Sequence, residues 1–454
     1  MNYEEFLLQK KHTANNFGIE AKYIPDKMFD FQKYVTQHLI LKGRAAGFLD
    51  TGLGKTLIEL SIGQNYIQST NKPILIMTPL AVAFQFVKEA EKFGIDDVQY
   101  SKDGRYTKKI ILTNYERLHY FNPSDFDCVI CDESSILKNF EGATKTAVTS
   151  FLKKIKYRYL FTATPSPNDF VELGTSSEAL GYLGYTDMLT KFFTNNEDTI
   201  SPMNIGTEWI LKGHAKDNFF KWVSGWSISC RKPSDLGFSD EKHVLPELIT
   251  NYHSVKNESN MVINGQMLMF NMVAKRLTEI KEENKLTIQH RCEKAYQLSH
   301  GKDTSVYWCN LNSEGDLLQH LDKSAYQIKG SMDIDKKEEL LLGFFQGDIK
   351  KLITKPKMTA FGLNWQHCNH TVYFPTFSYE QFYQAIRRFW RFGQQRDVVC
   401  DLVYSDGQKR VLDSLLAKTD KANELFTKLN TTLNQSYNIK TNPFDKPVTL
   451  PSFL

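Results

Sequence analysis

The stretch GFLDTGLGKTLIEL places two glycines, a lysine and a threonine between apolar residues. Binding a nucleotide phosphate requires backbone N–H groups turned toward one point at the start of a helix, whose dipole favours an anion. Gly52 and Gly54 would allow the close approach that such binding needs. Lys55 would place a cation on the β- and γ-phosphates, and Thr56 would offer a hydroxyl group to Mg²⁺.

One position of this stretch departs from the general G-x-x-x-x-G-K-[ST] pattern, which has glycine where this chain has Leu49. A tight turn that ends in a lysine is therefore the alternative interpretation. The remainder of the chain has to decide between the two.

A second candidate site is VICDESS, in which an apolar segment ends in two acidic residues. Asp132 is placed to hold Mg²⁺ through water, and Glu133 to polarise the attacking water, a division of labour that phosphoryl transfer requires. The alternative is a solvated acidic turn. The position after an apolar strand, downstream of a phosphate loop, favours the catalytic interpretation.

A third candidate site is QAIRRFWRFGQ, in which Arg388 and Arg391 would share one face of a helix. Guanidinium groups stabilise the charge that develops on a transferred γ-phosphoryl group. A basic surface helix is the alternative if the motif is taken alone. A nucleotide held by one domain and completed by arginines from the next would couple hydrolysis to domain closure.

The elements that must position these residues follow from alternating β-rich and helical segments, which predict parallel sheets with crossover helices. We expect a first α/β domain at 1–230 with a helical insertion from about 170, a link with a projecting helix at 231–284, and a second α/β domain at 285–454. The strands expected in the first domain are 46–49, 73–77, 109–112, 128–131 and 157–161, with helices at 56–67, 81–93 and 144–154. Those expected in the second are strands 304–309, 325–328, 351–354, 370–374 and 398–403, with helices at 315–321, 335–345 and 380–390.

The chain has 454 residues, of which 41% are hydrophobic and 24% charged, a composition typical of a globular protein. The net charge of +4 does not by itself argue for nucleic acid, so any basic face must be local. A polar N-terminal segment and seven cysteines, an odd number, favour a reducing, cytoplasmic setting. Cys128 and Cys131 have metal-ligand spacing, but their apolar surroundings favour two buried strand cysteines over a zinc site.

The order of these segments resembles that of superfamily 2 helicases, and most closely that of the Swi/Snf-type DNA translocases. Single motifs are weak, but eight or more in the right order are strong evidence. The resemblance covers nearly the whole chain and rests on these segments: Phe31-Gln32, Leu49–Thr56, Thr78-Pro79-Leu80, Thr113–Glu116, Asp132–Asn139, Thr162–Pro165, Ser305–Asn310, Ala360–Asn364 and Gln384–Gln394.

The resemblance implies two RecA-like lobes with an ATP cleft between them, and ATP with Mg²⁺ as cofactors. The residues it implies for catalysis are Lys55, Glu133, Arg388 and Arg391, and those for the metal are Thr56 and Asp132. Nucleotide-binding residues would be Phe31, Gln32, Thr51, Gly52, Leu53, Gly54, Lys55, Thr56 and Gln384. DNA-backbone contacts would come from Thr78, Pro79, Asn310, Lys355, Lys357 and Thr359, and should be salt-sensitive.

Two departures from the family pattern refine this expectation. Ser134-Ser135 replace the usual Ala-His or Ala-Asp, which leaves the metal and base positions intact but puts in question how nucleotide state is relayed. Lys355-Pro356-Lys357 stands where remodellers have Ser-Thr-Arg, and similar sequences occur among phage-encoded helicases. We therefore expect a minimal bacterial or bacteriophage enzyme of replication or recombination, which translocates on duplex DNA, with single strands as the alternative.

Two hypotheses from other classes are weighed against this one. A nucleotide-gated DNA clamp with little hydrolysis would keep Lys55 but would not need Glu133 together with the arginine pair. A kinase using the same phosphate loop would leave the second domain unexplained. ATPase rates with and without duplex DNA separate these possibilities, because a kinase should ignore DNA.

Overall fold

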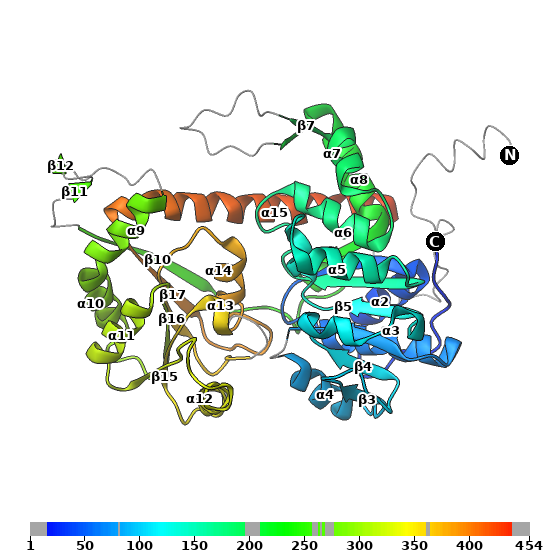
Figure 1. The fold of residues 1–454 in the computed structure, drawn as a ribbon, viewed down its shortest axis with the longest axis horizontal. Coiled ribbons are helices and arrows are strands. Elements are labelled where there is room, and N and C mark those ends of the chain that lie inside the picture. The colour runs from blue at the N-terminus through cyan, green and yellow to red at the C-terminus, as the bar shows by residue number, and fades with distance from the viewer. Residues whose placement is uncertain are drawn as a thin grey trace. The chain divides into compact units, whose positions relative to one another are not determined.

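The structure is a computed structural model, which describes residues 16–79, 82–195, 209–256, 262–263, 266–267, 277–359 and 364–437. The described residues form two compact units. The first comprises the residues up to His243 together with those from Lys421 onward, and the second comprises Val244–Asp420. Each unit is a RecA-like lobe, in which helices flank a parallel sheet (Figure 1).

The sheet of the first unit has seven parallel strands in the order β3-β4-β2-β5-β6-β1-β9. The carboxyl ends of β1, β6 and β5 therefore lie side by side, at the edge where open α/β sheets bind ligands. The strands are Arg44–Leu49 (β1), Ile74–Met77 (β2), Val98–Tyr100 (β3), Ile110–Thr113 (β4), Cys128–Cys131 (β5), Tyr157–Thr162 (β6) and Ser227–Cys230 (β9).

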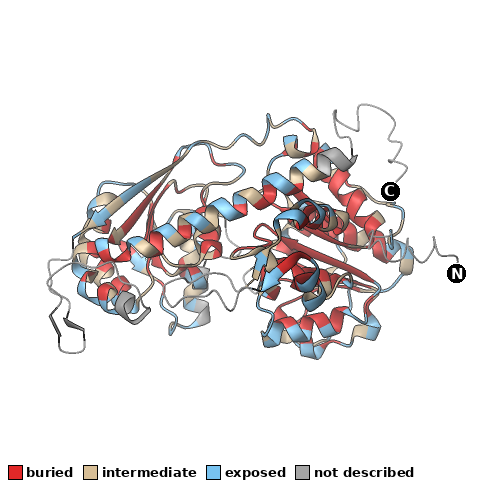
Figure 2. Ribbon diagram, turned by 90° about the horizontal axis from the view of Figure 1, so that it is seen from above, coloured by how far each residue is buried: buried red, intermediate tan, exposed pale blue. Residues whose placement is uncertain are grey.

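Helices cover both faces of this sheet. Neighbouring strand residues enter separate cores, as Leu75 and Ile76 of β2 show. Helices α2, α3 and α4 contribute to one core, and α5 to α8 to the other. The central strands β2, β4 and β5 are buried on both faces (red in Figure 2), which is why they are largely apolar in the sequence. The helices are Asp30–Lys42 (α2), Lys55–Thr70 (α3), Ala83–Lys92 (α4), Ala143–Leu152 (α5), Leu173–Leu180 (α6), Tyr185–Phe192 (α7) and Lys216–Trp226 (α8).

All five strands and three helices expected in this part of the chain are confirmed, and Cys128 and Cys131 are buried in β5. Strands β3 and β9 were not expected. Strand β3 has three half-buried residues, and β9 (SISC), which pairs with β1, carries two serines that are buried in the folded chain. The insertion that contains α6 to α8, together with the antiparallel pair Phe193–Asn195 (β7) and Trp209–Leu211 (β8), thus returns the chain to the sheet.

The sheet of the second unit has six parallel strands in the order β10-β17-β16-β13-β15-β14. Helices α12 and α14 contribute to the core on one face, and α10 and α11 to the core on the other. The strands are Leu248–Val255 (β10), Ser305–Trp308 (β13), Ala325–Gln327 (β14), Lys351–Thr354 (β15), His370–Tyr373 (β16) and Val398–Ser405 (β17). The helices are Leu277–Leu286 (α9), Ile288–Ser299 (α10), Asn312–Leu321 (α11), Ile334–Gln346 (α12), Pro356–Thr359 (α13) and Tyr379–Ile386 (α14), and a short pair is formed by Val262–Ile263 (β11) and Gln266–Met267 (β12).

The unit boundaries differ from those expected. Strand β10 pairs with β17 along its whole length, so the second unit begins at Val244 rather than near residue 285. Helix α15 (Lys409–Tyr437) begins in the second unit, but Leu425, Phe426 and Leu429 enter a core of the first. Most of the projecting helix that we expected lies outside the described residues. None of the described helices is both long and apolar enough to cross a membrane.

A polar cluster on the second sheet joins three strands through the buried Asp401. Its carboxylate accepts hydrogen bonds from Asn251 and is bonded to the Nε2 atoms of His253 and His370, each at 2.9 Å. His370 is bonded in turn to Ser305 through Nδ1 at 2.8 Å. Burial by itself would raise the pKa of Asp401. The hydrogen bonds outweigh that effect and hold the pKa at about 2.

Asp401→Asn is expected to show what this carboxylate contributes. The folded-state pKa lies below the unfolded one, so the ionised group stabilises the fold above pH 4 and loses that effect as the pH falls toward 2. We expect wild type to exceed the variant in unfolding free energy by about 2 kcal/mol near pH 6, with the difference vanishing toward pH 2. Urea unfolding across this range, with the exposed Asp413→Asn as control, measures it. A difference that is the same at every pH would contradict the assignment.

Candidate functional site

The phosphate loop connects β1, which ends at Leu49, to α3, which begins at Lys55. Gly52 and Gly54 have φ angles of 89° and 80°, in the left-handed region that favours glycine. Gly54 is also the N-cap residue of α3. The loop therefore turns into the start of a helix with both glycines in the conformation that their residue type permits, as the sequence predicts.

Gln32 supports this loop from α2. Its Nε2 donates to the Leu53 carbonyl at 2.9 Å, and its Oε1 accepts the Phe29 N–H at 2.9 Å. A Cβ atom on Gly54 would lie 2.3 Å from the Gln32 Nε2, so a larger residue there would displace the Gln32 amide from the loop. Phe31, the other residue expected near the nucleotide base, is buried.

The side chain of Lys55 lies over the same loop. Its ammonium donates to the carbonyls of Leu49 and Asp50, at 3.0 and 3.3 Å. The Thr51 N–H and hydroxyl both donate to the Asp50 carboxylate. A cation is thus held where the helix dipole also favours a phosphate.

Asp132 follows β5 and is 7% exposed. Its N–H donates to the Met77 carbonyl at 2.8 Å, and its carboxylate accepts from the Thr78 hydroxyl at 2.9 Å. Its carbonyl accepts from the Tyr115 hydroxyl at 2.6 Å. Burial raises the pKa of Asp132, while Lys55 and the Thr78 hydroxyl act in the opposite direction.

Glu133 has φ and ψ of 52° and 50°, a left-handed conformation that is uncommon for a residue other than glycine. Its Oε1 accepts from the Thr162 hydroxyl at 3.0 Å and from the Ser135 hydroxyl at 3.3 Å. Thr162 is the last residue of β6, the strand between β5 and β1. A strained residue held by two hydroxyl groups at a ligand-binding edge is typical of a positioned catalytic base.

The residues at this edge suit a Mg²⁺ ion that is bound together with a nucleotide. Such an ion usually takes one or two carboxylates and completes its shell with phosphates and water. Asp132 supplies a buried carboxylate, and Thr56, in the first turn of α3, supplies a hydroxyl. Within the described ranges no cluster of three or more His, Cys, Asp or Glu side chains is placed to hold a metal ion.

The arginine pair of the second unit does not lie on a helix, contrary to the expectation. Helix α14 ends at Ile386, and Arg388 and Arg391 follow in turns. Hydrogen bonds from other segments end the helix, because they occupy carbonyls that would otherwise accept helical N–H groups. The Trp365 N–H donates to the Arg388 carbonyl at 3.0 Å, and the Gln394 side-chain amide donates to the Phe389 carbonyl at 3.3 Å.

The two arginines differ in their surroundings. Arg388 is 2% exposed, and its guanidinium lies 5.1 Å from the Trp365 ring centroid. Arg391 is only partly buried. Gln384, expected at the nucleotide, is buried in α14. Arg391 is therefore the member of the pair whose side chain solvent can reach more readily.

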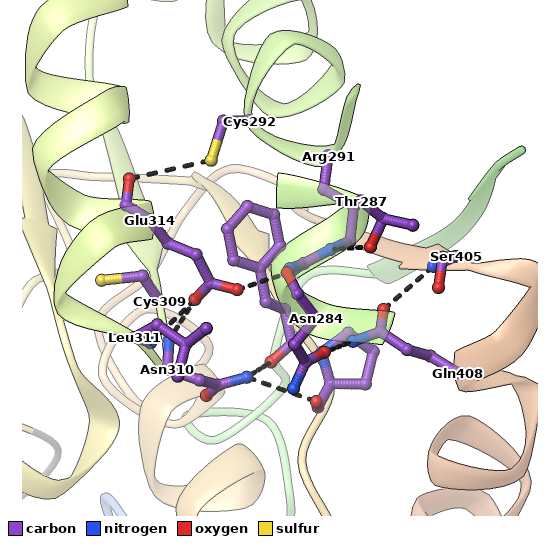
Figure 3. A network of polar contacts seen from close by, with 12 residues as sticks. Asn284, Thr287, Arg291, Cys292, Cys309, Asn310, Leu311, Glu314, Ser405 and Gln408 are labelled. Carbon is purple, nitrogen blue, oxygen red and sulfur yellow. Dashed lines mark hydrogen bonds and ion pairs between the residues drawn. The ribbon is translucent and has the colours of Figure 1, made fainter. Parts of the chain in front are cut away.

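Asn310, a candidate DNA contact, belongs to a buried polar network of the second unit (Figure 3). Its side-chain amide donates to the carbonyl of Phe374 at 3.1 Å, and its N–H donates to the Glu314 carboxylate at 2.8 Å. Glu314 forms a fully buried ion pair with Arg291 at 2.6 Å. This network holds the loops that follow β13 and β16, so the Asn310 side chain has a structural role whatever else it contacts.

The other candidate DNA contacts differ in exposure. Lys357 is exposed, Lys355 is partly exposed and bonded to Asn312 at 2.7 Å, and Pro79 is partly exposed. Thr78, in contrast, is fully buried, with its hydroxyl on Asp132. The side chain of Thr359 and residues 80 and 360–363 of the expected motifs lie outside the described residues.

Three further residues lie at the candidate site without a role predicted from the sequence. Thr162 and Tyr115 lie in motifs that the resemblance includes, but no role was assigned to them. Glu59, one helical turn after Lys55, is fully buried. Burial and then the neighbouring Asp132 raise its pKa well above the usual value, against the influence of Lys55. The four-residue spacing from Lys55 was the available signal.

Comparison with known proteins supports the assignment. Residues 27–167 match a family model described as "Type III restriction enzyme, res subunit". The chain is 24% identical to an uncharacterized ATP-dependent helicase, YqhH of Bacillus subtilis, over 87% of this chain and 77% of the relative.

Two eukaryotic relatives match over shorter stretches. One is the bovine DNA annealing helicase and endonuclease ZRANB3, 29% identical over 36% of this chain. The other is a SWI/SNF-related matrix-associated actin-dependent regulator of chromatin, subfamily A-like protein 1, of Xenopus tropicalis, 26% identical over 29% of this chain. The matched stretches cover only 17% and 15% of those relatives.

The fold has solved counterparts. Dbp5 of Saccharomyces cerevisiae, solved with RNA and ADP BeF3, covers 90% of this chain with a TM-score of 0.54 at 13% identity, and 94% of its own chain is covered. At that identity the similarity shows the fold alone. The motif order, this fold and the ATP-dependent helicase relative together make the chain similar to superfamily 2 helicases of the Swi/Snf-like type, and they support an enzyme that binds and hydrolyses ATP.

Proposed function

We propose that the chain couples ATP hydrolysis to movement along DNA, preferably duplex DNA, in replication or recombination of a bacterium or bacteriophage. One observation carries the catalytic part. At adjacent strand ends the structure brings together the Lys55 loop, the buried carboxylate of Asp132, and Glu133 held by Thr162. This combination suits nucleotide hydrolysis better than nucleotide binding alone, because a clamp has no need of an oriented base.

In the proposed reaction the backbone of the loop and Lys55 hold the triphosphate. Mg²⁺, when bound, would neutralise charge on the phosphates, and Asp132 and Thr56 would hold it. Glu133 accepts a proton from the attacking water, whose position Thr162 sets indirectly by orienting the carboxylate. Arg391 stabilises the charge on the transferred phosphoryl group, and Arg388 supports it.

DNA contacts in this proposal go to phosphates, through Pro79, Asn310, Lys355, Lys357 and Thr359. Such contacts carry affinity and not sequence information. The low net charge restricts them to a local basic surface. The motif resemblance to DNA translocases favours DNA over RNA as the substrate.

An ATPase assay across duplex DNA, single-stranded DNA, forks and RNA at two salt concentrations tests the proposal. We expect the largest stimulation with duplex DNA, and less of it at the higher salt concentration. An ATPase rate that no nucleic acid changes would favour the kinase alternative. Nucleotide-dependent DNA binding without ATP turnover would favour the clamp. Displacement of a strand from a blunt duplex would contradict translocation without strand separation.

Lys355→Ala combined with Lys357→Ala is expected to weaken duplex binding at all sequences alike. Loss of each phosphate contact should lower the slope of log K against log salt by about 1. Fluorescence anisotropy at several salt concentrations measures that slope. Lys323→Ala serves as the control, because Lys323 is an exposed lysine of the same unit that precedes β14. An unchanged slope in the double variant would remove these lysines from the DNA interface.

A further inference from the structure

Asp132 is held at three points by residues of two neighbouring segments. Its N–H donates to the Met77 carbonyl, its carbonyl accepts from the Tyr115 hydroxyl at 2.6 Å, and its carboxylate accepts from the Thr78 hydroxyl at 2.9 Å. Met77 and Thr78 end β2, and Tyr115 follows β4. The N–H, the carbonyl and the carboxylate of Asp132, the residue expected to hold Mg²⁺, are thus each hydrogen-bonded to a different residue.

The sheet order makes this arrangement possible. Strand β2 lies between β4 and β5, so the loops that leave the three strands meet at one edge. The Thr78 N–H adds a bond to the Thr113 carbonyl at 2.9 Å, which joins the end of β2 to the end of β4. A shift of either loop would be passed to Asp132 through hydrogen bonds.

The same bonds exclude a direct phosphate contact by Thr78 in this arrangement. A hydroxyl group has one O–H to donate, and a phosphate oxygen only accepts. The hydroxyl of Thr78 already donates to Asp132, and its N–H donates to Thr113. The residue is also fully buried. It has no donor left for a nucleic-acid backbone.

We propose that Thr78 is a positioning residue, which orients the Asp132 carboxylate and links it to the loop that begins at Pro79. The proposal rests on the proposed function, because it takes Asp132 as the group that holds Mg²⁺. Nucleic acid that contacts the loop after β2 would act on the metal site through the Thr78 hydroxyl. The residue thus connects the expected DNA surface to catalysis without touching DNA.

Removing this hydroxyl should weaken metal binding. Thr78→Val keeps the shape of the side chain but removes the hydroxyl group that donates to the buried Asp132 carboxylate. Hydrogen bonds to charged groups have energies that correspond to about a tenfold change or more in an equilibrium constant. Thr78→Ser keeps the hydroxyl and should restore binding.

The experiment measures Mn²⁺ binding to the full chain by electron paramagnetic resonance, with a non-hydrolysable ATP analogue present. We expect about tenfold weaker binding in Thr78→Val and less than a twofold change in Thr78→Ser. Duplex-DNA affinity without nucleotide, and its salt dependence, should equal those of wild type in both variants. Thermal unfolding checks that each variant folds, and Thr78→Ala replaces Thr78→Val if the latter does not.

Two results would overturn the inference while leaving the proposed function intact. One is unchanged Mn²⁺ binding in Thr78→Val. The other is weaker duplex binding with a shallower salt dependence, which would make Thr78 a phosphate contact after all. A wild-type chain that binds no Mn²⁺ with the analogue would instead overturn the proposed function, and this inference with it.

Discussion

Glu133→Gln is expected to lower the ATP turnover number by about 10²–10⁴-fold while nucleotide binding stays within a few-fold of wild type. The amide cannot accept a proton from water, whereas Lys55, Gly54 and the rest of the phosphate loop are untouched. Glutamine has the shape of glutamate and adds no strain to the left-handed backbone, and its amide oxygen can still accept the bond from Thr162, so the fold should persist. Single-turnover kinetics and an equilibrium measurement of ATP affinity together separate the two effects.

Glu141→Gln is the matched control for this prediction. Glu141 is an exposed residue of the same segment, a few positions further along the chain. Its replacement should leave turnover and ATP affinity unchanged. If Glu133→Gln kept turnover within about threefold of wild type, Glu133 would not be the base. If both variants lost turnover together, the segment as a whole would be responsible.

Arg391→Ala is expected to lower turnover by about 10³-fold or more, because arginines of this type stabilise the charge on the transferred phosphoryl group. Arg391→Lys should not restore it, since an ammonium group cannot reproduce the planar fork of a guanidinium group. Arg391 is the better target of the pair, because the packing of Arg388 against Trp365 would mix a loss of stability with a loss of catalysis. The measurement is the turnover number at saturating ATP, beside thermal unfolding of each variant.

Arg396→Ala provides the comparison for Arg391. Arg396 is exposed, lies five positions further along the chain, and bonds to the His367 carbonyl. Its removal should cost little turnover. Equal losses in both variants would point to the net charge of the segment and not to a single guanidinium group. Turnover unaffected by Arg391→Ala would remove that residue from catalysis.

The central strands, the phosphate loop and the acidic pair after β5 could be predicted because each is marked by residues that are adjacent in the sequence. Strands β2, β4 and β5 are short, largely apolar runs that a sheet buries on both faces. The glycines of the phosphate loop and the acidic pair after β5 follow such strands directly. Their position at the ligand-binding edge is a consequence of strand direction alone.

Edge strands, helix ends and side-chain partners were decided by contacts between distant segments. Strand β9 becomes a strand through β1, and β10 through β17, although neither has a strong apolar pattern. Helix α14 stops before Arg388 because the Trp365 segment supplies competing hydrogen bonds. The second half of α15 joins the first unit through Leu425 and Phe426.

The sequence by itself therefore determined the fold class and the family resemblance, and it predicted Lys55, Asp132 and Glu133 as a nucleotide site. Only the tertiary structure decided that the Thr78 hydroxyl lies on Asp132, and that the Asn310 side-chain amide donates to the Phe374 carbonyl. The physical reason is that a motif records which groups are present within a few residues. A hydroxyl or amide chooses its partner among all groups that folding brings within hydrogen-bonding distance, and most of those come from elsewhere in the chain.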